Sequence, residues 1–407
     1  MYAPTSMPTH GWAPLPEDVA TLGAAGADQA VAYLAHREHN DPTPLHRLDG
    51  LADELGVGSV FVKDEGYRLG LGSFKALGGS YVVTRLVLEE AARRLGHPVD
   101  VGDLQTDAVR AVAATMTFAC ATDGNHGRSV AQGAQLVGAE AAIFMHGGVS
   151  DERVAAIERF GARIIRVDGS YDDSIIEAAR VAEAEGWTVL SDTSWPGYEA
   201  IPALVSQGYT VLVRESLDAM TKPPTHVLVQ AGVGGFAAAV AGHLAAVLGA
   251  DRPHVIVVEP ERAACLFASN AAGGIVTVPG AEPTVMAMLE CYEPSPLAWR
   301  VLERVADGFV TLGEDESPAA MRRLAQPAAG DPPIVAGESG VAGLAGLVQL
   351  TADPELRRQT GLDDHAIVLV INTEGATDPE LYTTLVGSTP EQVLSAAFMA
   401  SGDPATA

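Results

Sequence analysis

The feature that most constrains this sequence is a repeated alternation of short, apolar, β-branched segments with longer segments of helical periodicity. Strands that are apolar on both faces are typical of parallel sheets, because crossover helices cover both faces of such sheets. The alternation therefore predicts an α/β fold made of two doubly wound parallel-sheet domains. Strands are expected at 59–63, 116–122, 141–146, 162–167, 187–192, 225–232, 254–261 and 366–375.

Helices are expected between several of these strands. Ser150 is a favourable N-cap for one of them, and Gly96 and Gly161 are favourable residues for ending a helix. Residues 1–45 are rich in proline and polar side chains, which predicts an irregular lead-in. The helical patterns cover 74–96, 127–138, 151–160 and 172–186.

The length of 407 residues suffices for two domains at roughly 100–200 residues each. Hydrophobic residues make up 47% of the chain and charged residues 19%, so a sizeable core can be buried. We expect a larger, discontinuous domain formed by 1–85 and 205–407, with a smaller α/β domain inserted at 86–204.

The charge balance limits the possible partners. The formal net charge of -27 repels phosphate backbones and anionic lipids, so neither nucleic acid nor a membrane surface is an expected partner. The N-terminal residues show no basic segment followed by an apolar run, and the longest apolar stretch is broken by His243. Cys120, Cys265 and Cys291 form no CxxC pair, so no metal site is expected. These patterns predict a cytoplasmic protein.

Ligands of open parallel sheets bind beyond the carboxyl ends of the strands. The segments that follow predicted strands are therefore the places to look for chemistry. They are 120–127, 192–198, 231–236 and 371–378.

Lys75 lies in GSFKALGGS, at the start of an otherwise apolar helical segment. A lysine at a helix N-terminus is unfavourable for the helix dipole. It is either a surface lysine whose stem packs on apolar neighbours, or an amine that holds a carbonyl cofactor as a Schiff base.

The segment QAGVGGFAAAVAGHL (230–244) is a strand–glycine–helix unit. Its glycines can expose backbone N–H groups at a helix N-terminus, which suits a phosphate. The same segment matches G-x-G-x-x-A and is followed by Glu259, so a dinucleotide site with Glu259 on the ribose is an alternative. A purely structural glycine turn is a third interpretation.

Two polar loops contain possible acid–base groups. In ATDGNHGRSVA, Asn125 can donate to an oxygen, while Asp123 and His126 can move protons. In SDTSWPGYEAIP, Asp192 precedes Trp195, and a carboxylate beside aromatic rings is expected to have a raised pKa and to act as an acid. As local features, helix capping explains the first loop equally well and is the preferred explanation of Asp192.

Two further segments complete the set of candidates. GESGVAGLAGL (337–347) opens a helix with small residues, and INTEGATD (371–378) ends a buried strand with Thr373. The hydroxyl of Thr373 can contact a ring nitrogen without protonating it. Ordinary strand–loop–helix packing is the alternative for both segments.

In this order, the segments resemble the tryptophan-synthase-β family of pyridoxal-phosphate (PLP) enzymes, known as fold type II. SFKALGG resembles its cofactor-lysine motif, DGNHG the loop that contacts the phenolic oxygen of the cofactor, and AGVGG its phosphate loop. The resemblance runs from about residue 40 to about residue 385 and is strongest to the lyases of this family that act on diaminopropionate.

The resemblance implies a role for each candidate residue, with the cofactor in the cleft between two domains. Lys75 would carry the cofactor and act as a base, and Asp123 and Asp192 would be the acid–base pair. Phe74 would pack beside the cofactor, Asn125 would hold its phenolic oxygen, and Glu338 would line the site. The phosphate would bind Gly232, Val233, Gly234 and Gly235, and Thr373 would face the ring nitrogen.

The implied reaction is a PLP-dependent α,β-elimination that converts 2,3-diaminopropionate, in its L and also its D form, to pyruvate and two ammonia molecules. The expected partners are a small amino-acid substrate and a second copy of the chain in a homodimer. One alternative is a serine, threonine or 3-hydroxy-amino-acid dehydratase on the same fold. The other is an NAD-dependent oxidoreductase that uses 230–259.

Overall fold

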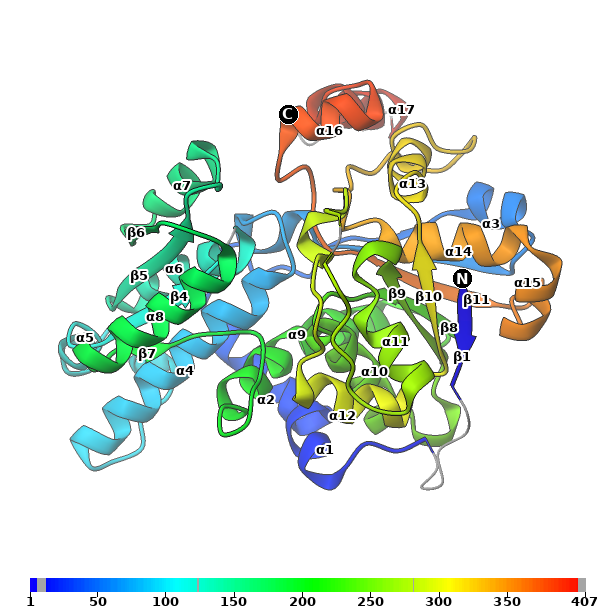
Figure 1. Cartoon of the computed structure of the whole chain (residues 1–407). Coiled ribbons are helices and arrows are strands. Elements are labelled where there is room, and N and C mark those ends of the chain that lie inside the picture. Colours follow the sequence, from blue (N-terminus) through cyan, green and yellow to red (C-terminus); the bar gives the residue numbers. More distant parts are fainter. Residues whose placement is uncertain (6–11, 123, 281, 402–407) are drawn as a thin grey trace. The chain divides into compact units, whose positions relative to one another are not determined.

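The computed structural model describes residues 1–5, 12–122, 124–280 and 282–401. These residues divide into two compact units (Figure 1). Unit 1 contains 1–24, 42–67 and 212–407, and unit 2 contains 25–41 and 68–211. The unit boundaries lie at 24/25, 41/42, 67/68 and 211/212, whereas the sequence analysis placed the domain boundaries at 85/86 and 204/205.

Unit 1 is built on a seven-stranded sheet with the order β1-β10-β9-β8-β11-β3-β2. The inner strands are parallel, as the apolar sequence pattern predicts, and β1 and β2 add antiparallel edges. The strands are β1 (Tyr2–Pro4), β2 (Leu45–Arg47), β3 (Ser59–Asp64), β8 (His226–Gln230), β9 (His254–Pro260), β10 (Gly308–Leu312) and β11 (Ile367–Asn372).

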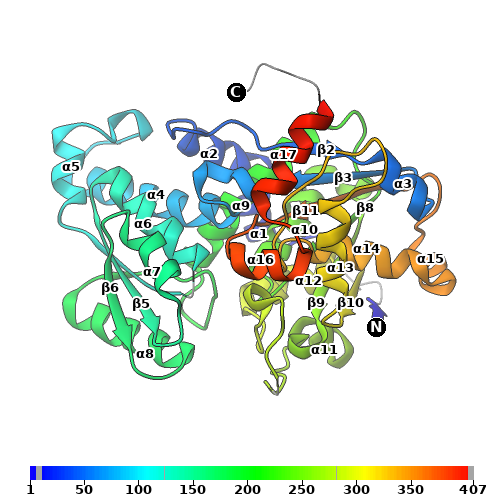
Figure 2. The same cartoon turned by 90° about the horizontal axis from the view of Figure 1, so that it is seen from above.

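Helices pack on both faces of this sheet because side chains alternate along each strand. Leu228 and Val258 share a core with Leu344 and Leu347 of α14, which lies along one face (Figures 1 and 2). The intervening residues of β8 point to the other face, where α10 packs. The helices are α1 (Pro16–Leu22), α3 (Asp49–Leu55), α10 (Gly235–Leu248), α11 (Cys265–Ala272), α12 (Pro296–Val305), α13 (Glu316–Ala325), α14 (Ala342–Ala352), α15 (Pro354–Thr360), α16 (Pro379–Val386) and α17 (Pro390–Ser401).

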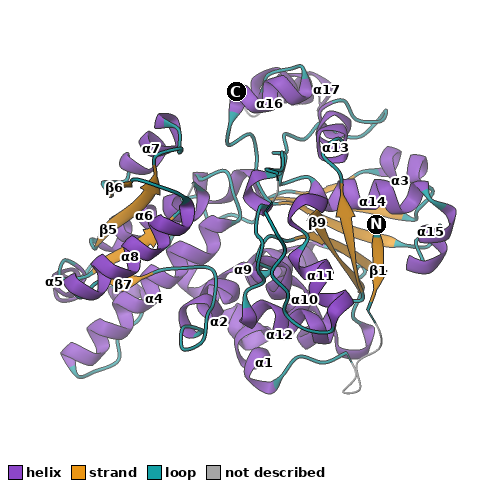
Figure 3. Cartoon of the chain, viewed as in Figure 1, coloured by secondary structure: helices purple, strands orange, loops and turns teal. Residues whose placement is uncertain are grey.

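Unit 2 contains a four-stranded, all-parallel sheet with the order β6-β5-β4-β7 (Figure 3). On β5, Ala142 and Phe144 pack on α8, whereas Ile143 points to the opposite face, beside Gly127 of α6. The strands are β4 (Thr117–Ala121), β5 (Glu140–His146), β6 (Arg163–Val167) and β7 (Thr188–Val189); the helices are α2 (Ala24–Leu34), α4 (Lys75–Leu95), α5 (Asp107–Ala113), α6 (Asn125–Val137), α7 (Asp151–Glu158), α8 (Tyr171–Glu185) and α9 (Ala200–Ala219), the last of which continues into unit 1.

Two sequence-based expectations were wrong. The irregular lead-in expected over 1–45 contains β1, α1 and α2, because Pro16 starts one helix and an alanine-rich segment forms the next. The strand expected at 187–192 is only Thr188–Val189. The hydroxyl of Tyr198 accepts from the Ser191 N–H at 3.1 Å and donates to the Val189 carbonyl at 2.8 Å. A side chain thus provides the hydrogen bonds that a neighbouring strand would otherwise provide to these backbone groups.

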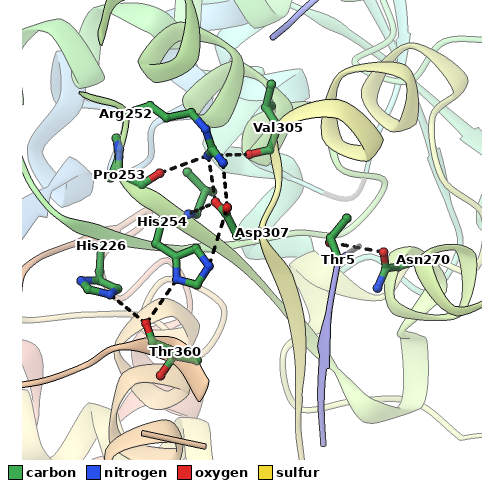
Figure 4. A network of polar contacts seen from close by, with 10 residues as sticks. Thr5, His226, Arg252, Pro253, His254, Asn270, Val305, Asp307 and Thr360 are labelled. Carbon is green, nitrogen blue, oxygen red and sulfur yellow. Dashed lines mark hydrogen bonds and ion pairs between the residues drawn. The ribbon is translucent and has the colours of Figure 1, made fainter. Parts of the chain in front are cut away.

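The amino ends of β8, β9 and β10 are joined by a charged network on the edge of the unit 1 sheet away from the strand-following loops (Figure 4). Asp307 accepts two hydrogen bonds from Arg252, at 2.8 and 2.7 Å, and a third from the Val255 N–H. Ring nitrogens of His226 and His254 lie 2.9 and 3.2 Å from the Thr360 carbonyl. This network holds the strand starts in register.

Candidate active site

In unit 2, the parallel pairing of β4 with β7 brings the loops that follow them to one edge of the sheet. Asn125 begins α6 after β4, and Asp192 lies in the loop after β7. The N-terminus of α4 also approaches this loop, because Lys75 Nζ lies 2.5 Å from Asp192 Oδ2. Two segments separated by 117 residues therefore meet in one ion pair.

Lys75 is the first residue of α4, where the helix dipole disfavours a positive charge. The Asp192 carboxylate offsets that cost, and the two side chains are each 22% exposed. The pair therefore places an amine and a carboxylate in direct contact at a partly covered position. Schiff-base chemistry needs such an amine, and elimination needs a group such as the carboxylate that can exchange a proton.

The pKa of Asp192 is lowered, whereas the sequence had predicted a raised value. Burial works to raise it, but the positive charge of Lys75 and the hydrogen bond from Lys75 outweigh that effect. The expectation of a raised pKa was wrong because it considered only the burial suggested by the neighbouring aromatic rings. The positive charge that lowers the pKa belongs to Lys75, which is 117 residues away in the sequence.

The chain contains three lysines, at 63, 75 and 222. Lys63 is committed to structure, since its buried amine contacts Glu215 Oε2 at 2.6 Å and the Thr43 carbonyl at 2.7 Å. Lys222 lies in an exposed turn after α9. Lys75 is thus the lysine whose environment fits a covalent role.

The first turn of α6, which follows β4, adds two buried residues. Asn125 is 9% exposed, and His126 is 5% exposed. The His126 Nε2 lies 3.2 Å from the Leu190 carbonyl, so Nε2 carries the hydrogen and Nδ1 presents a lone pair that has no partner in the described part of the chain. Burial lowers the pKa of His126 and keeps its ring neutral. Asp123 lies outside the described residues.

Aromatic and glycine contacts fix the first turn of α4. The ring of Phe74 packs on that of Tyr209, with ring centroids 4.8 Å apart. A Cβ on Gly78 would come within 2.7 Å of the Tyr209 ring, so the glycine that follows Lys75 in the motif permits this close packing. The Tyr209–Phe74 contact orients the residue just before Lys75.

In unit 1, the glycine segment forms a tight turn between β8 and α10. Gly234 has φ +97°, which side-chain-bearing residues rarely adopt, and a Cβ on Gly232 would come within 2.9 Å of the Cys291 sulfur. Cys265 Sγ lies 3.8 Å from the Gly232 carbonyl. The turn therefore leads directly into the N-terminus of a 14-residue helix, the arrangement that favours a phosphate.

Glu259 cannot serve as the ribose acid of a dinucleotide site. Its carboxylate is fully buried and accepts from the N–H groups of Leu266 and Phe267, at 2.8 and 2.7 Å. Burial raises its pKa to about 8, although these two hydrogen bonds act to lower it. Glu259 thus caps the start of α11, and the oxidoreductase interpretation of 230–259 loses the residue on which it depended.

Thr373 and Glu338 lie in unit 1 and are 4% and 3% exposed. The backbone carbonyl of Glu338 accepts a short hydrogen bond from the Ser317 hydroxyl. The Thr373 hydroxyl accepts from the amide of Gln230 at 3.0 Å. The sequence analysis did not identify Gln230, although a polar residue at the end of the otherwise apolar β8, directly before the glycines, was a usable signal.

These residues fit PLP on their own chemistry. The glycine turn suits its phosphate, the Lys75 amine its aldehyde, and the Thr373 hydroxyl, whose hydrogen has no acceptor among the described residues, suits its ring nitrogen. Lys75, Phe74, Asn125 and Asp192 are in unit 2; the glycines, Glu338 and Thr373 are in unit 1.

Comparison with known proteins identifies the family of this chain. Residues 36–374 match the family model described as pyridoxal-phosphate dependent enzyme. The diaminopropionate ammonia-lyase of Escherichia coli strain K12 is 41% identical over 370 residues, covering 88% of this chain and 92% of the relative. The same-named protein of Salmonella typhimurium is 37% identical over 84% of this chain and 87% of its own length.

Solved structures show the same similarity. The Escherichia coli diaminopropionate ammonia lyase in complex with an aminoacrylate-PLP azomethine reaction intermediate superposes with a TM-score of 0.84 at 37% identity, over 95% of this chain and 96% of that one. Its complex with D-serine gives 0.85 over the same shares. The chain belongs to the family of pyridoxal-phosphate-dependent enzymes, with the α/β architecture of fold type II.

Proposed function

We propose that this enzyme eliminates ammonia from 2,3-diaminopropionate and releases pyruvate and two ammonia molecules. The observation that carries the proposal is the 2.5 Å pair of Lys75 and Asp192, an amine and an acid in direct contact at the sheet edge expected for a ligand. The similarity to two diaminopropionate ammonia-lyases supports the choice of substrate.

Each residue at the site would have one task in holding the cofactor. The amine of Lys75 would bind its aldehyde carbon, Asn125 its phenolic oxygen and Phe74 one side of its ring. Thr373 would contact the ring nitrogen, and Glu338 would line the site. The phosphate would be held by Gly232, Val233, Gly234 and Gly235.

PLP, when bound, supplies an electron sink for the negative charge that forms when the α-proton is removed. The chain supplies the proton transfers. Lys75 would accept the α-proton of an L-substrate, and Asp192 would deliver a proton to the departing β-amino group. Asp123, which lies outside the described residues, remains our candidate base for a D-substrate.

The electrostatics of Asp192 suit this role. Its lowered pKa depends on the positive charge of Lys75. When the Lys75 amine is engaged by a carbonyl group, that charge weakens and burial becomes the main influence, so the Asp192 pKa rises toward that of a useful acid. An amine must leave in protonated form, which explains why an acid beside the lysine matters for this substrate.

Counting products tests the proposal. Purified protein would be incubated with 2,3-diaminopropionate, and pyruvate and ammonia would be measured in the same sample, with serine as the comparison substrate. We expect two ammonia molecules per pyruvate from diaminopropionate and a much slower reaction with serine. Preferred turnover of serine or threonine, with one ammonia per pyruvate, would assign the enzyme to the hydroxy-amino-acid dehydratases instead.

We also propose that the enzyme works as a homodimer, as the family resemblance implies. Its place in the cytoplasm is proposed from the sequence patterns described above. None of the helices in the described ranges combines the length and the apolar character needed to cross a membrane. Light scattering of the purified holoenzyme should give about twice the 42.1 kDa of one chain. A mass equal to one chain at working concentrations would contradict the dimer.

A further inference from the structure

Gln230 is the last residue of β8 and lies directly before the glycine turn. It is 1% exposed, and its amide nitrogen Nε2 lies near several acceptors at once. The distances from Nε2 are 2.7 Å to the Gly340 carbonyl, 3.0 Å to the Ile371 carbonyl and 3.4 Å to the Ser339 carbonyl. The Thr373 hydroxyl oxygen lies 3.0 Å from the same nitrogen. One buried amide thus connects the end of β8 to the loop at Gly340 and to Thr373, the residue proposed to contact the ring nitrogen of the cofactor.

The three carbonyl groups fix the orientation of this amide. Carbonyl oxygens only accept hydrogen bonds, so the side-chain nitrogen of Gln230 must face them and the side-chain oxygen must point away. That oxygen, Oε1, has no hydrogen-bond partner among the described residues. Turning the amide over would place Oε1 against three carbonyl oxygens, which excludes the opposite orientation.

The orientation of Gln230 sets what the Thr373 hydroxyl can do. An amide nitrogen offers hydrogens and no usable lone pair, so the hydroxyl can accept from Gln230 but cannot donate to it. The nearby Gly340 carbonyl already accepts from the Thr373 N–H, at 3.3 Å, as well as from Gln230, which occupies both its lone pairs. Within the described ranges, nothing accepts the hydrogen of the Thr373 hydroxyl.

We propose that Gln230 is a positioning residue that makes the Thr373 hydroxyl a hydrogen-bond donor to the ring nitrogen of the cofactor. This inference rests on the proposed PLP site and goes beyond it, because it names a buried residue that holds the Thr373 hydroxyl in its donating orientation. A ring nitrogen that accepts from Thr373 stays unprotonated. Gln230 would thereby set the electronic state of the cofactor without touching it.

Cofactor affinity tests the direction of this hydrogen bond. The dissociation constants of PLP and of its 1-deaza analogue, which has C–H in place of the ring nitrogen, would be measured with the apoenzyme. The wild type should prefer PLP by about two- to tenfold, the worth of one neutral hydrogen bond. Thr373→Val should abolish the preference, whereas Thr373→Ser should keep it.

Gln230→Met is the decisive variant, because it removes the donor with little change in volume. Its loss removes the hydrogen bond that the Thr373 hydroxyl accepts, so that nothing from position 230 then fixes the rotation of this hydroxyl. We expect the preference for PLP to fall to less than about twofold. Gln349→Met is the matched control, since Gln349 is a second glutamine of unit 1 whose Oε1 has no partner among the described residues. It should keep the preference of the wild type.

The outcomes separate this inference from the proposed function. A wild type that binds no PLP contradicts the function itself. A preference that Thr373→Val abolishes but Gln230→Met leaves intact overturns the role of Gln230 alone. If Gln230→Met does not fold, nitrogen NMR of wild-type enzyme loaded with ¹⁵N-ring-labelled PLP decides. An unprotonated, hydrogen-bonded nitrogen supports the inference, and a pyridinium signal overturns it.

Discussion

At the residue scale, the proposed chemistry depends on one close ion pair, in which Lys75 lowers the pKa of Asp192. Lys75 and Asp192 are each only 22% exposed, so either charge left alone would be poorly solvated. Their contact stabilises the lysine at an unfavourable helix end and the aspartate in a partly buried loop. In the proposed mechanism, engaging the lysine in chemistry would raise the proton affinity of the aspartate and would couple cofactor binding to acid catalysis.

Asp192→Asn should lower turnover of diaminopropionate by about 10²- to 10⁴-fold, because the amide keeps the shape of the side chain but cannot deliver a proton. The protein should still bind PLP and show its visible absorbance. Steady-state kinetics and an absorbance spectrum of the same preparation check both statements. Asp173→Asn, which changes an exposed aspartate of the same unit, is the control. Equal turnover in the two variants would remove Asp192 from the mechanism.

Local sequence context identified Lys75 and Asp192 but not their mutual effect. The motif around Lys75 and the aromatic loop after Asp192 are visible in the sequence, whereas their contact spans 117 residues and appears only in the fold. Gln230 was missed for the same reason, since its importance lies in partners at 340, 371 and 373. Sequence patterns locate reactive groups more readily than they locate the neighbours that tune them.

At the scale of elements, α4 and α6 are held together where they carry Lys75 and Asn125. Ser129 Oγ of α6 accepts from the Ser80 N–H at 3.0 Å and donates to the Ala76 carbonyl at 3.2 Å. Glycines let the helices approach this closely. This packing ties the first turn of the lysine helix to the loop after β4.

Gly133→Ala tests this packing. Its Cβ would come within 2.9 Å of the Ser80 Cα, a backbone atom that cannot move independently. We expect a loss of about 1–3 kcal/mol in the free energy of unfolding, although alanine is the better helix former. Urea denaturation measures it. Gly147→Ala in the same unit, where a Cβ would meet nothing within 4 Å, should be neutral, and a similar stability of the two variants would contradict the packing argument.

The elements with strong periodicity were the ones that the sequence predicted well. The helix expected at 74–96 is α4 (Lys75–Leu95), ended as expected by Gly96 in the left-handed conformation, and Ser150 caps α7. The helices α1 and α2 were missed because proline and polar residues surround them. The edge strands β1 and β2 are three residues each, too short to show any period.

At the scale of the whole molecule, buried histidines link stability to pH. Burial lowers the pKa of His126, His226 and His243 below the ordinary value of 6.5. Between the folded and unfolded pKa values, the unfolded chain binds more protons than the folded one. The free energy of unfolding should therefore rise with pH in that window and fall as the pH drops through 6.5.

His226→Gln isolates one of these contributions. His226 lies in the network of Figure 4, where a ring nitrogen is 2.9 Å from the Thr360 carbonyl, and glutamine does not titrate. From about pH 7.5 to about pH 5.5, the wild type should lose more stability than the variant. Denaturant titrations at each pH measure the difference. If the free energies of unfolding of the wild type and the variant change equally with pH, His226 binds its proton equally well in the folded and the unfolded protein, and the prediction is wrong.

The most direct test of the central claim is to fix the cofactor chemically and find where it is attached. Borohydride reduction of the PLP-loaded enzyme makes the link to lysine permanent, and peptide mass spectrometry then identifies the modified residue among only three lysines. The account predicts a phosphopyridoxyl group on Lys75 and none on Lys63 or Lys222. A label on either of the other lysines, or reduced enzyme that carries no label, would contradict it.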